Sequence, residues 1–345
     1  MKSKRAKSLQ RVGGKTMLEM ICKTAESISA KITLIVGFDK NSIINESKSF
    51  DFEISTCEQA SPIGTGDAVK CGINEVDDAD KVLVLYGDVP LIKKETLENL
   101  VSTDDKSLTI LSTKVDNPFG YGRVKKDNDG NVTQIIEEKD ASNADKKISE
   151  IFTGILCCNK ALLAEALEEI KNDNAAGEYY LTDIVSIINK KGFKIKTCIV
   201  PNEEVKGANT KKELSELEET FRKMKSEDLL EMGITVSDPN RVDVRGEVSA
   251  GTDCIIDVNV ILDGVVKLGD NVSIGPNTIL KDVEIGNNTS IEAFSHLVSS
   301  KVGKDCIIGP YARLREGSQI DDSAKVGNFV ETKNTTLGKG SKADR

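Results

Sequence analysis

The C-terminal third of the sequence repeats with a period of six residues. Aliphatic residues recur at every sixth position in three series, which are separated by two five-residue steps. The series are Ile256, Leu262, Leu268, Ile274 and Leu280; Ile285, Ile291 and Leu297; and Val302, Ile308, Leu314, Ile320 and Val326. Helices and hairpins do not have this period, but a prism of short parallel strands does, because each side sends one aliphatic residue inward and glycine tolerates the corners. The pattern predicts a left-handed parallel β-helix.

The N-terminal part alternates strand-like and helical segments from Thr16 to about Val200. Residues 31–36 and 81–86 are continuous apolar runs rich in branched side chains, which are typical of strands buried in a parallel sheet. Helical spacing lies between them, so we expect βαβ units that bind ligands at the carboxyl ends of the strands. Residues 122–138 are predicted to form a hairpin around an Asp-Gly turn.

A single helix is expected to join these two parts. Residues 211–232 carry dense charge, with apolar residues at intervals of three or four, and Gly233 follows as the C-terminal stop. We therefore divide the chain into an α/β domain over residues 1–210, a linker helix over 211–233 and the β-helix over 234–345.

Composition excludes several classes of function. With 56 acidic and 47 basic residues the net charge is −9, and the chain has no Trp and 4% aromatic residues, which disfavours a nucleic-acid partner. No apolar run approaches the ~18 residues that span a bilayer, so we expect no membrane insertion. The eight cysteines form no C-x-x-C pair, and no apolar segment of a signal peptide follows the basic start. A soluble, cytoplasmic protein with reduced thiols is expected.

The strongest local motif is Leu85-Tyr-Gly-Asp-Val-Pro90. It places the carboxylate of Asp88 at the end of a buried strand, where α/β proteins bind ligands. A hard oxygen ligand at this place suits Mg²⁺ that bridges to phosphates. The alternative is that Asp88 only caps the next turn.

A glycine-rich junction precedes that strand. Gly64 and Gly66 let a ligand approach the backbone, and Gln59 and Thr65 offer donors and acceptors for a nucleobase. A plain helix-start turn is the alternative reading of these residues.

Six motifs occur in an order that resembles one enzyme family. They are Gln59…Gly64-Thr-Gly66, Tyr86-Gly-Asp-Val-Pro90, Gly120-Tyr-Gly-Arg123, Glu137-Glu-Lys-Asp140, Gly177-Glu-Tyr-Tyr-Leu-Thr-Asp183 and Gly207-Ala-Asn209, followed by a long helix and hexapeptide repeats. Over essentially its whole length the chain resembles the bacterial bifunctional enzymes that are both UDP-N-acetylglucosamine pyrophosphorylase and glucosamine-1-phosphate N-acetyltransferase. The resemblance implies a Rossmann-like nucleotidyltransferase domain and a role in cell-envelope precursor synthesis.

The resemblance also implies a role for each matching residue. It assigns Mg²⁺ to Asp88 and Asn209, and assigns Lys7, in the opening basic run, to the reacting phosphates, where a point charge stabilises charge that develops during transfer. The nucleotide-binding residues it implies are Gln59, Gly64, Thr65, Tyr86 and Gly87. The sugar-binding residues it implies are Gly122, Glu137, Thr182 and Asn209. Without the resemblance, Lys7 would be read as a solvated charge.

The implied reaction is an in-line attack of N-acetylglucosamine 1-phosphate on the α-phosphorus of UTP, which depends on positioning more than on an acid–base pair. The acetyltransferase half would use acetyl-CoA, with Arg315 and Lys333 holding the amino-sugar phosphate. A homotrimer assembled through the β-helix is also implied.

Three departures from the family pattern bear on activity. The family's first strand and its glycine-rich phosphate loop would precede Met1, so we expect unpaired ladders inside the sheet. Phe152 stands where the family has an Asn that contacts the sugar nucleotide, and a phenyl ring cannot supply those hydrogen bonds. Arg345, the last residue, takes the place of the catalytic histidine, and its guanidinium cannot act as a base at neutral pH. We therefore expect acetyl transfer to be absent.

Two alternatives stay open at this point. One is a monofunctional sugar-1-phosphate nucleotidyltransferase whose β-helix serves assembly only, and the other is a non-catalytic trimerising scaffold. The single histidine, His296, falls beside Leu297 at a five-residue step of the repeat, and we interpret it as a surface or corner residue.

Overall fold

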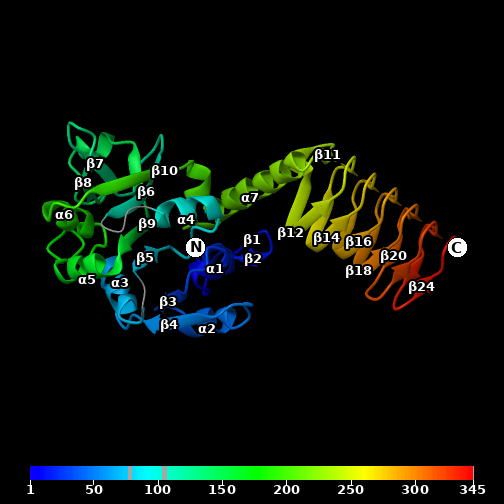
Figure 1. Ribbon diagram of the computed structural model, residues 1–345, viewed down its shortest axis with the longest axis horizontal. Coiled ribbons are helices and arrows are strands. Elements are labelled where there is room, and N and C mark those ends of the chain that lie inside the picture. The colour runs from blue at the N-terminus through cyan, green and yellow to red at the C-terminus, as the bar shows by residue number, and fades with distance from the viewer. Residues whose placement is uncertain (77–79, 103–106, 345) are drawn as a thin grey trace. The chain divides into compact units, whose positions relative to one another are not determined.

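The computed structural model describes residues 1–76, 80–102 and 107–344. The chain divides into two compact units, which are treated separately below (Figure 1). The first unit contains residues 1–11 and 16–214, and the second contains residues 12–15 and 215–345. None of the described helices is long and apolar enough to cross a membrane.

A six-stranded sheet forms the centre of the first unit. Its order is β10 (Ile195–Ile199), β6 (Leu108–Lys114), β9 (Glu150–Asn159), β7 (Arg123–Lys126) and β8 (Val132–Ile136), with β5 (Lys81–Val84) also paired with β9. β6 and β10 are parallel, whereas β9 runs antiparallel to β5, β6 and β7. The sheet is therefore mixed, and the expectation that the run 81–86 forms a parallel-sheet strand is wrong, because a pairing partner far along the chain is not encoded in the local pattern.

A second, two-stranded parallel sheet lies apart from the first. It consists of β3 (Ile32–Val36) and β4 (Ile54–Glu58). In the described part of the chain β3 pairs only with β4, and β5 pairs only with β9, so one edge of each strand has no partner. This agrees with the expected unpaired ladders. It also explains why three of the five residues of β3 and all four of β5 are only partly buried, although their apolar runs predicted complete burial.

Helices cover both faces of the six-stranded sheet. On β9, Leu156 and Cys158 pack with the helices α3 (Thr65–Ile73), α5 (Lys160–Glu168) and α6 (Asp183–Lys190). The intervening residues Ile155 and Cys157 face α1 (Met17–Glu26) and α4 (Lys94–Val101) instead. This two-residue alternation is what a strand between two helical layers requires. Helix α2 (Lys40–Ser47) packs against β4.

The predicted hairpin is present as β7 and β8. Their turn is closed by Asp127, whose Oδ1 accepts the N–H groups of Asp129 and Asn131 at 3.0 and 2.8 Å. Gly130 adopts a φ of +84°, which side chains rarely allow, and so accounts for the Asp-Gly signal.

Helix α7 (Lys211–Glu231) confirms the predicted long helix. Gly233, at φ +84°, follows it, and the N–H of Ile234 donates to the carbonyl of Leu229 at 3.1 Å. Leu229 and Ile234 are buried together, so the helix ends in the glycine-dependent cap that the sequence indicated.

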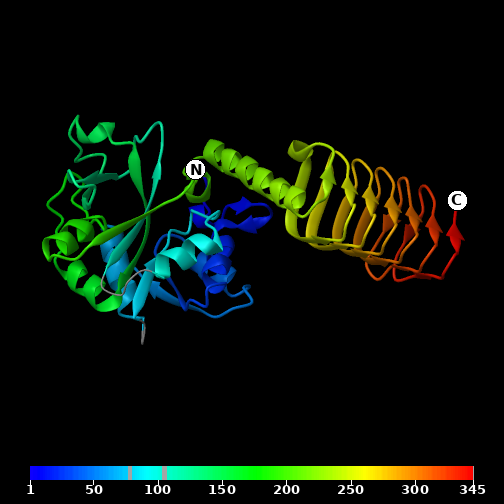
Figure 2. The same ribbon diagram turned by 45° about the horizontal axis from the view of Figure 1, so that its top comes forward.

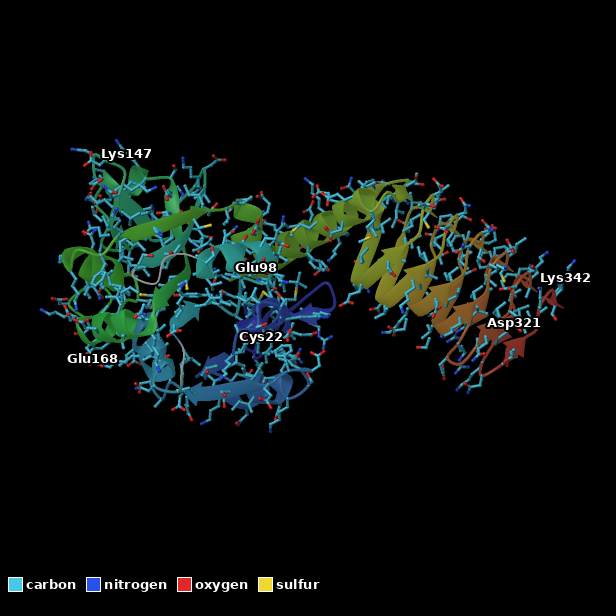
Figure 3. The ribbon with its side chains drawn as sticks, viewed as in Figure 1. Cys22, Glu98, Lys147, Glu168, Asp321 and Lys342 are labelled. Atoms are coloured by element: carbon cyan, nitrogen blue, oxygen red, sulfur yellow. The ribbon has the colours of Figure 1, made fainter. Side chains whose placement is uncertain are left out.

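The second unit contains the parallel β-helix of hexapeptide repeats (Figure 2). Its strands run from β11 (Thr235–Val236) to β25 (Lys342–Ala343), and strands on successive coils pair 17 or 18 residues apart, as with Ile274 and Ile291. Every aliphatic residue of the three six-residue series lies in one buried core. Charged side chains such as Asp321 lie on the outside of the coils (Figure 3).

The two five-residue steps are shortened corners. They fall inside β16 (Ile279–Ile285) and β18 (His296–Val302), at Asp282 and Ser299, which have φ values of +52° and +42°. The register between β14 (Val260–Leu268) and β16 shifts at the same corner. A coil therefore loses one residue at the corner while the inward positions on its sides are kept.

Three aromatic rings stack along another corner of the β-helix. The ring centroids of Phe294 and Tyr311 are 4.9 Å apart, and those of Tyr311 and Phe329 are 5.2 Å apart. All three residues have φ between +56° and +61°, a conformation that is unfavourable for bulky side chains. Because stacking offsets this backbone strain, we infer that the ring column holds successive coils together.

We predict that Tyr311→Ala lowers the free energy of unfolding of the β-helix by about 1–2 kcal/mol, because two ring contacts are lost while the backbone strain remains. Tyr311→Phe keeps the stack and should match the wild type, and Tyr311→Gly should recover part of the loss by relieving the positive φ. Chemical denaturation of the purified chain measures these differences. Equal stability of the Ala variant and the wild type would contradict the role of the stack.

Candidate functional site

Lys7, Asp88 and Asn209 meet at one point of the first unit. The Lys7 ammonium forms an ion pair with Asp88 Oδ2 and donates to Asn209 Oδ1 at 2.8 Å. Asp88 Oδ2 and Asn209 Oδ1 therefore contact the same cation, the Lys7 ammonium, although the three residues are far apart in sequence. A metal ion shared by Asp88 and Asn209 would also require the two side chains to lie this close together.

Local backbone contacts position these three residues. Asp88 follows β5 in a turn that is closed by a 3.1 Å bond from the N–H of Val89 to the carbonyl of Tyr86. A side chain at Gly207 would approach the carbonyl oxygen of Asp88 to 3.1 Å, so the glycine brings the segment of Asn209 close to Asp88.

Asn209 is held in place by the start of helix α7. The side chain of Glu213 accepts the backbone N–H of Asn209 at 2.6 Å, and the N–H of Glu213 donates to Thr210 Oγ1 at 3.1 Å. The N–H of Thr210 also donates to Glu213 Oε2, at 3.3 Å, so Thr210 and Glu213 form a capping box. It fixes the backbone beside the Asn209 amide.

The donor set at this point fits magnesium. One carboxylate and one amide oxygen are hard ligands, and proteins typically bind Mg²⁺ through one or two such groups plus substrate phosphates. The described residues contain no cluster of three or more His, Cys, Asp or Glu side chains, so a fully protein-made cage is not offered elsewhere in that part of the chain. Asp88 and Asn209 are the residues that would hold the ion.

The predicted nucleotide-binding residues form a second, connected group. Gln59 Nε2 donates to the carbonyl of Gly64 at 3.1 Å and to Asp67 Oδ2 at 2.8 Å, which holds the side-chain amide against the start of α3. Thr65 accepts the N–H of Leu181 at 3.1 Å and is hydrogen-bonded to the phenol of Tyr86. Burial raises the pKa of Tyr86 to about 12, so the phenol stays protonated.

Gly64 and Gly154 are required by close packing at this group. Gly64 has φ +140°, and a Cβ there would lie 2.3 Å from the carbonyl oxygen of Tyr179. A Cβ at Gly154 would lie 2.5 Å from the ring of Tyr86. The Gly-Glu-Tyr-Tyr motif therefore forms a wall against the glycine-rich junction, and the N–H of Gly66 bonds to Tyr179 at 2.8 Å.

Three of the four residues predicted to bind the sugar, Gly122, Glu137 and Thr182, also lie together, whereas Asn209 lies at the Lys7 centre. Thr182 donates to Glu137 Oε1 at 3.0 Å, and a Cβ on Gly122 would lie 3.7 Å from the same oxygen. Burial, the main cause, raises the pKa of Glu137, and the nearby Asp140 and Glu178 raise it further, against the hydrogen bond from Thr182. Carboxylate and hydroxyl groups in this arrangement suit the hydroxyl groups of a sugar.

Sequence reasoning missed Tyr121, Arg123 and Glu138 as parts of this region. Partial burial raises the pKa of Tyr121, with additional contributions from the charges of Glu213 and Asp88. Arg123 is buried and paired with Glu138 at 2.5 Å. The signal that could have found these residues was their place in the Gly-Tyr-Gly-Arg and Glu-Glu-Lys-Asp motifs.

Phe152 contributes packing and not polar contacts. Its side chain is buried in the core with Leu108 and Leu156, and only its backbone N–H bonds to the site, at 2.9 Å to the carbonyl of Gly122. The backbone of Phe152 thus holds Gly122, while its phenyl ring packs in the core.

In the second unit, Arg315 and Lys333 occupy matching positions on successive coils. The Arg315 N–H bonds to the carbonyl of Thr332 at 2.9 Å. Both cations already have carboxylate partners: Arg315 pairs with Glu331 at 2.9 Å and Lys333 with Glu316 at 3.0 Å. A phosphate bound here would have to compete with these glutamates. Arg345 lies outside the described residues.

His296 starts strand β18, outside the hydrophobic core of the β-helix. It pairs with Ile279 and Arg313 on the neighbouring coils and is partly buried. Burial, with a smaller contribution from Arg313, lowers its pKa and favours the neutral ring. The sequence indicates a surface or corner residue at His296. Its position in strand β18 places it on a side of the prism.

Comparison with known proteins gives matches to both units. Residues 1–179 match the MobA-like NTP transferase domain, and residues 266–298 match the bacterial transferase hexapeptide (six repeats). The "Bifunctional protein GlmU" of Alkalilimnicola ehrlichii is 41% identical over 346 residues, which cover 100% of this chain and 74% of that protein. The proteins of the same name from Pseudoalteromonas atlantica and Acinetobacter baumannii are each 42% identical and are each covered to 76% of their length.

A solved structure resembles the first unit in fold. The nucleoside-diphosphate-sugar pyrophosphorylase from Vibrio cholerae aligns with a TM-score of 0.50 and 17% identity, covering 63% of this chain and 93% of that one. At this identity the likeness concerns the fold alone.

Asp183 generates a prediction on pH. Its pKa is raised to about 6, first by burial and then by the charges of Asp173, Glu137 and Asp140. Since the folded-state pKa lies above the ordinary value, this group loses its favourable contribution to stability as the pH rises through about 6. We expect Asp183→Asn to raise Tm at pH 7.5 by about 2–4 °C. This shift corresponds to a stabilisation of about 1 kcal/mol, after allowance for solvent screening of the partly exposed carboxyl group.

The gain from Asp183→Asn should shrink towards pH 5, where the wild-type carboxyl is mostly protonated. Thermal unfolding of both proteins at several pH values measures it. Asp129→Asn, in the exposed hairpin turn, is the matched control and should not reproduce the gain in Tm at pH 7.5. A gain that is the same at pH 5 and pH 7.5 would contradict the prediction.

Proposed function

Because the chain belongs to the GlmU family of bifunctional proteins, we propose that its first unit transfers UMP from UTP to N-acetylglucosamine 1-phosphate. The products are UDP-N-acetylglucosamine and pyrophosphate. The observation that carries the proposal is the convergence of Lys7, Asp88 and Asn209 at the carboxyl end of β5.

In the proposed reaction an oxygen of the sugar 1-phosphate attacks the α-phosphorus of UTP. The new phosphorus–oxygen bond forms as the bond from the α-phosphorus to the bridging oxygen breaks, and pyrophosphate leaves with both electrons of that bond. No group has to be activated by a strong base, because the phosphate is already an anion. The protein contributes orientation and charge stabilisation.

The groups of the site divide this work. Lys7 brings a positive charge to the phosphates, and Asp88 and Asn209 would hold Mg²⁺, which neutralises phosphate charge when it is bound. Gln59 and Thr65, with Gly64, Tyr86 and Gly87, form the nucleotide side of the site. Glu137 and Thr182, beside the Gly122 backbone, form the sugar side and accept or donate hydrogen bonds to hydroxyl groups.

One observation in the β-helix bears on the family's second activity. Arg315 and Lys333 lie on neighbouring coils and present two cations. On the basis of the family, we propose that they would hold the phosphate of glucosamine 1-phosphate, while acetyl transfer from acetyl-CoA is still expected to be absent because Arg345 stands in the place of the catalytic histidine. A cytoplasmic homotrimer assembled through the β-helix is proposed on the same basis.

We predict that Asp88→Asn lowers kcat/KM for formation of UDP-N-acetylglucosamine by about 10²–10³-fold, because the carboxylate that would hold Mg²⁺ is lost and with it charge stabilisation of the reacting phosphates. Pyrophosphate release from UTP and N-acetylglucosamine 1-phosphate at fixed Mg²⁺ is the measurement. Glu168→Gln is the control, since Glu168 is an exposed carboxylate on α5 that pairs with Lys70 (Figure 3). It should have full activity.

Two results would refute the proposal. One is wild-type protein that neither releases pyrophosphate nor binds UTP with Mg²⁺ in calorimetry, which would favour a non-catalytic scaffold. The other is turnover with a clear preference for another nucleotide or another sugar phosphate, which would favour a different nucleotidyltransferase.

A further inference from the structure

The segment 118–122 carries Gly122 to the sugar side of the site, and its own side chains do not anchor it. Phe119 is 74% exposed and Tyr121 is 47% exposed. A Cβ on Gly120 would have no neighbour within 4 Å. Apolar packing of Phe119, Gly120 and Tyr121 therefore does not fix this segment, and its position depends on polar contacts to its backbone.

Arg123 and Glu138 supply those contacts. One terminal nitrogen of Arg123 donates to the carbonyl of Tyr121, and the other pairs with Glu138 Oε2 at 2.5 Å. The same Glu138 oxygen accepts the N–H of Gly120 at 3.2 Å. The ion pair of Arg123 and Glu138 thus holds the N–H of Gly120 and the carbonyl of Tyr121. The carbonyl of Gly122 accepts the backbone N–H of Phe152.

The ion pair is a costly way to stabilise a fold. Arg123 is 1% exposed, and its Nε is buried with no hydrogen-bond partner in the described part of the chain. Buried ion pairs commonly contribute no more to stability than apolar side chains of similar size, and an unpaired buried donor adds a penalty. What the pair supplies is a fixed geometry for the backbone it holds.

We propose that Arg123, acting through Glu138, is a positioning residue for the sugar 1-phosphate in the nucleotidyl transfer proposed above, on which this inference rests. The contacts lead to the sugar side: Gly122 lies beside Glu137, which accepts from Thr182. In the described part of the chain, no hydrogen bond or ion pair joins Arg123 or Glu138 to Gln59 or Thr65. Loss of the ion pair therefore displaces the sugar-binding backbone and leaves the nucleotide side in place.

The test compares Arg123→Lys and Glu138→Gln with wild type in steady-state kinetics. Lysine keeps the charge but loses the planar fork that reaches two acceptors, and Glu138→Gln removes the charge of the partner carboxylate at a partly exposed position. Each variant should raise KM for N-acetylglucosamine 1-phosphate by about 10–100-fold. KM for UTP should change less than about threefold, well below the rise expected for the sugar 1-phosphate.

Lys126→Met is the matched control. Lys126 lies on the same strand, β7, and its ion pair with Glu150 at 2.6 Å does not touch the segment 118–122. It should lower Tm without changing either KM. The double variant Arg123→Lys with Glu138→Gln should be no worse than the poorer single variant, because the two residues act as one unit.

Calorimetric titration with UDP-N-acetylglucosamine gives a readout that needs no turnover, and its Kd should rise with KM. Unchanged KM and Kd in active, folded variants overturn the inference, as does an equal rise of KM for both substrates. Wild-type protein without turnover and without product binding refutes the proposed function itself, and this inference with it. The two failures are thus distinguished by the behaviour of the wild type.

Discussion

The ammonium of Lys7 between Asp88 and Asn209 is the contact on which the chemistry proposed for the first unit depends. Three segments from the start, middle and end of that unit must approach one another closely to make it. One glycine assists this approach, because a Cβ on Gly207 would lie 3.1 Å from the backbone of Asp88 and would crowd it. The carboxylate of Asp88 and the amide of Asn209 can therefore reach the same cation.

The β-helix could be predicted almost entirely from the sequence, and the α/β unit only in part. An inward position every six residues is a local steric rule, so Ile256 to Val326 could be assigned without knowing the partners. Sheet order depends on pairings between distant segments, which local patterns do not encode. The antiparallel pairing of β5 with β9 and the ring column at Tyr311 were missed for this reason.

The site residues were assigned from ordered motifs, and the structure adds how they are held. The resemblance assigned Glu137 of the motif Glu137-Glu-Lys-Asp140 to the sugar and gave no role to Glu138. The structure shows that these two carboxylates have different partners. Glu137 accepts from Thr182, while Glu138 pairs with Arg123 and accepts from Gly120. No pattern of residue types predicted the contacts of Glu138, because they depend on how the hairpin of β7 and β8 folds.

These adjacent carboxylates show how the environment separates two roles. Desolvation raises the pKa of Glu137, because its charge is poorly solvated in the partly buried site. Hydrogen bonds from a bound ligand would stabilise that charge. The hydrogen bond from Arg123 lowers the pKa of Glu138, which keeps that group ionised and tied to the backbone of Gly120. Glu138 therefore holds the segment 118–122 in place. Glu137 is the carboxylate that the proposed sugar ligand would contact.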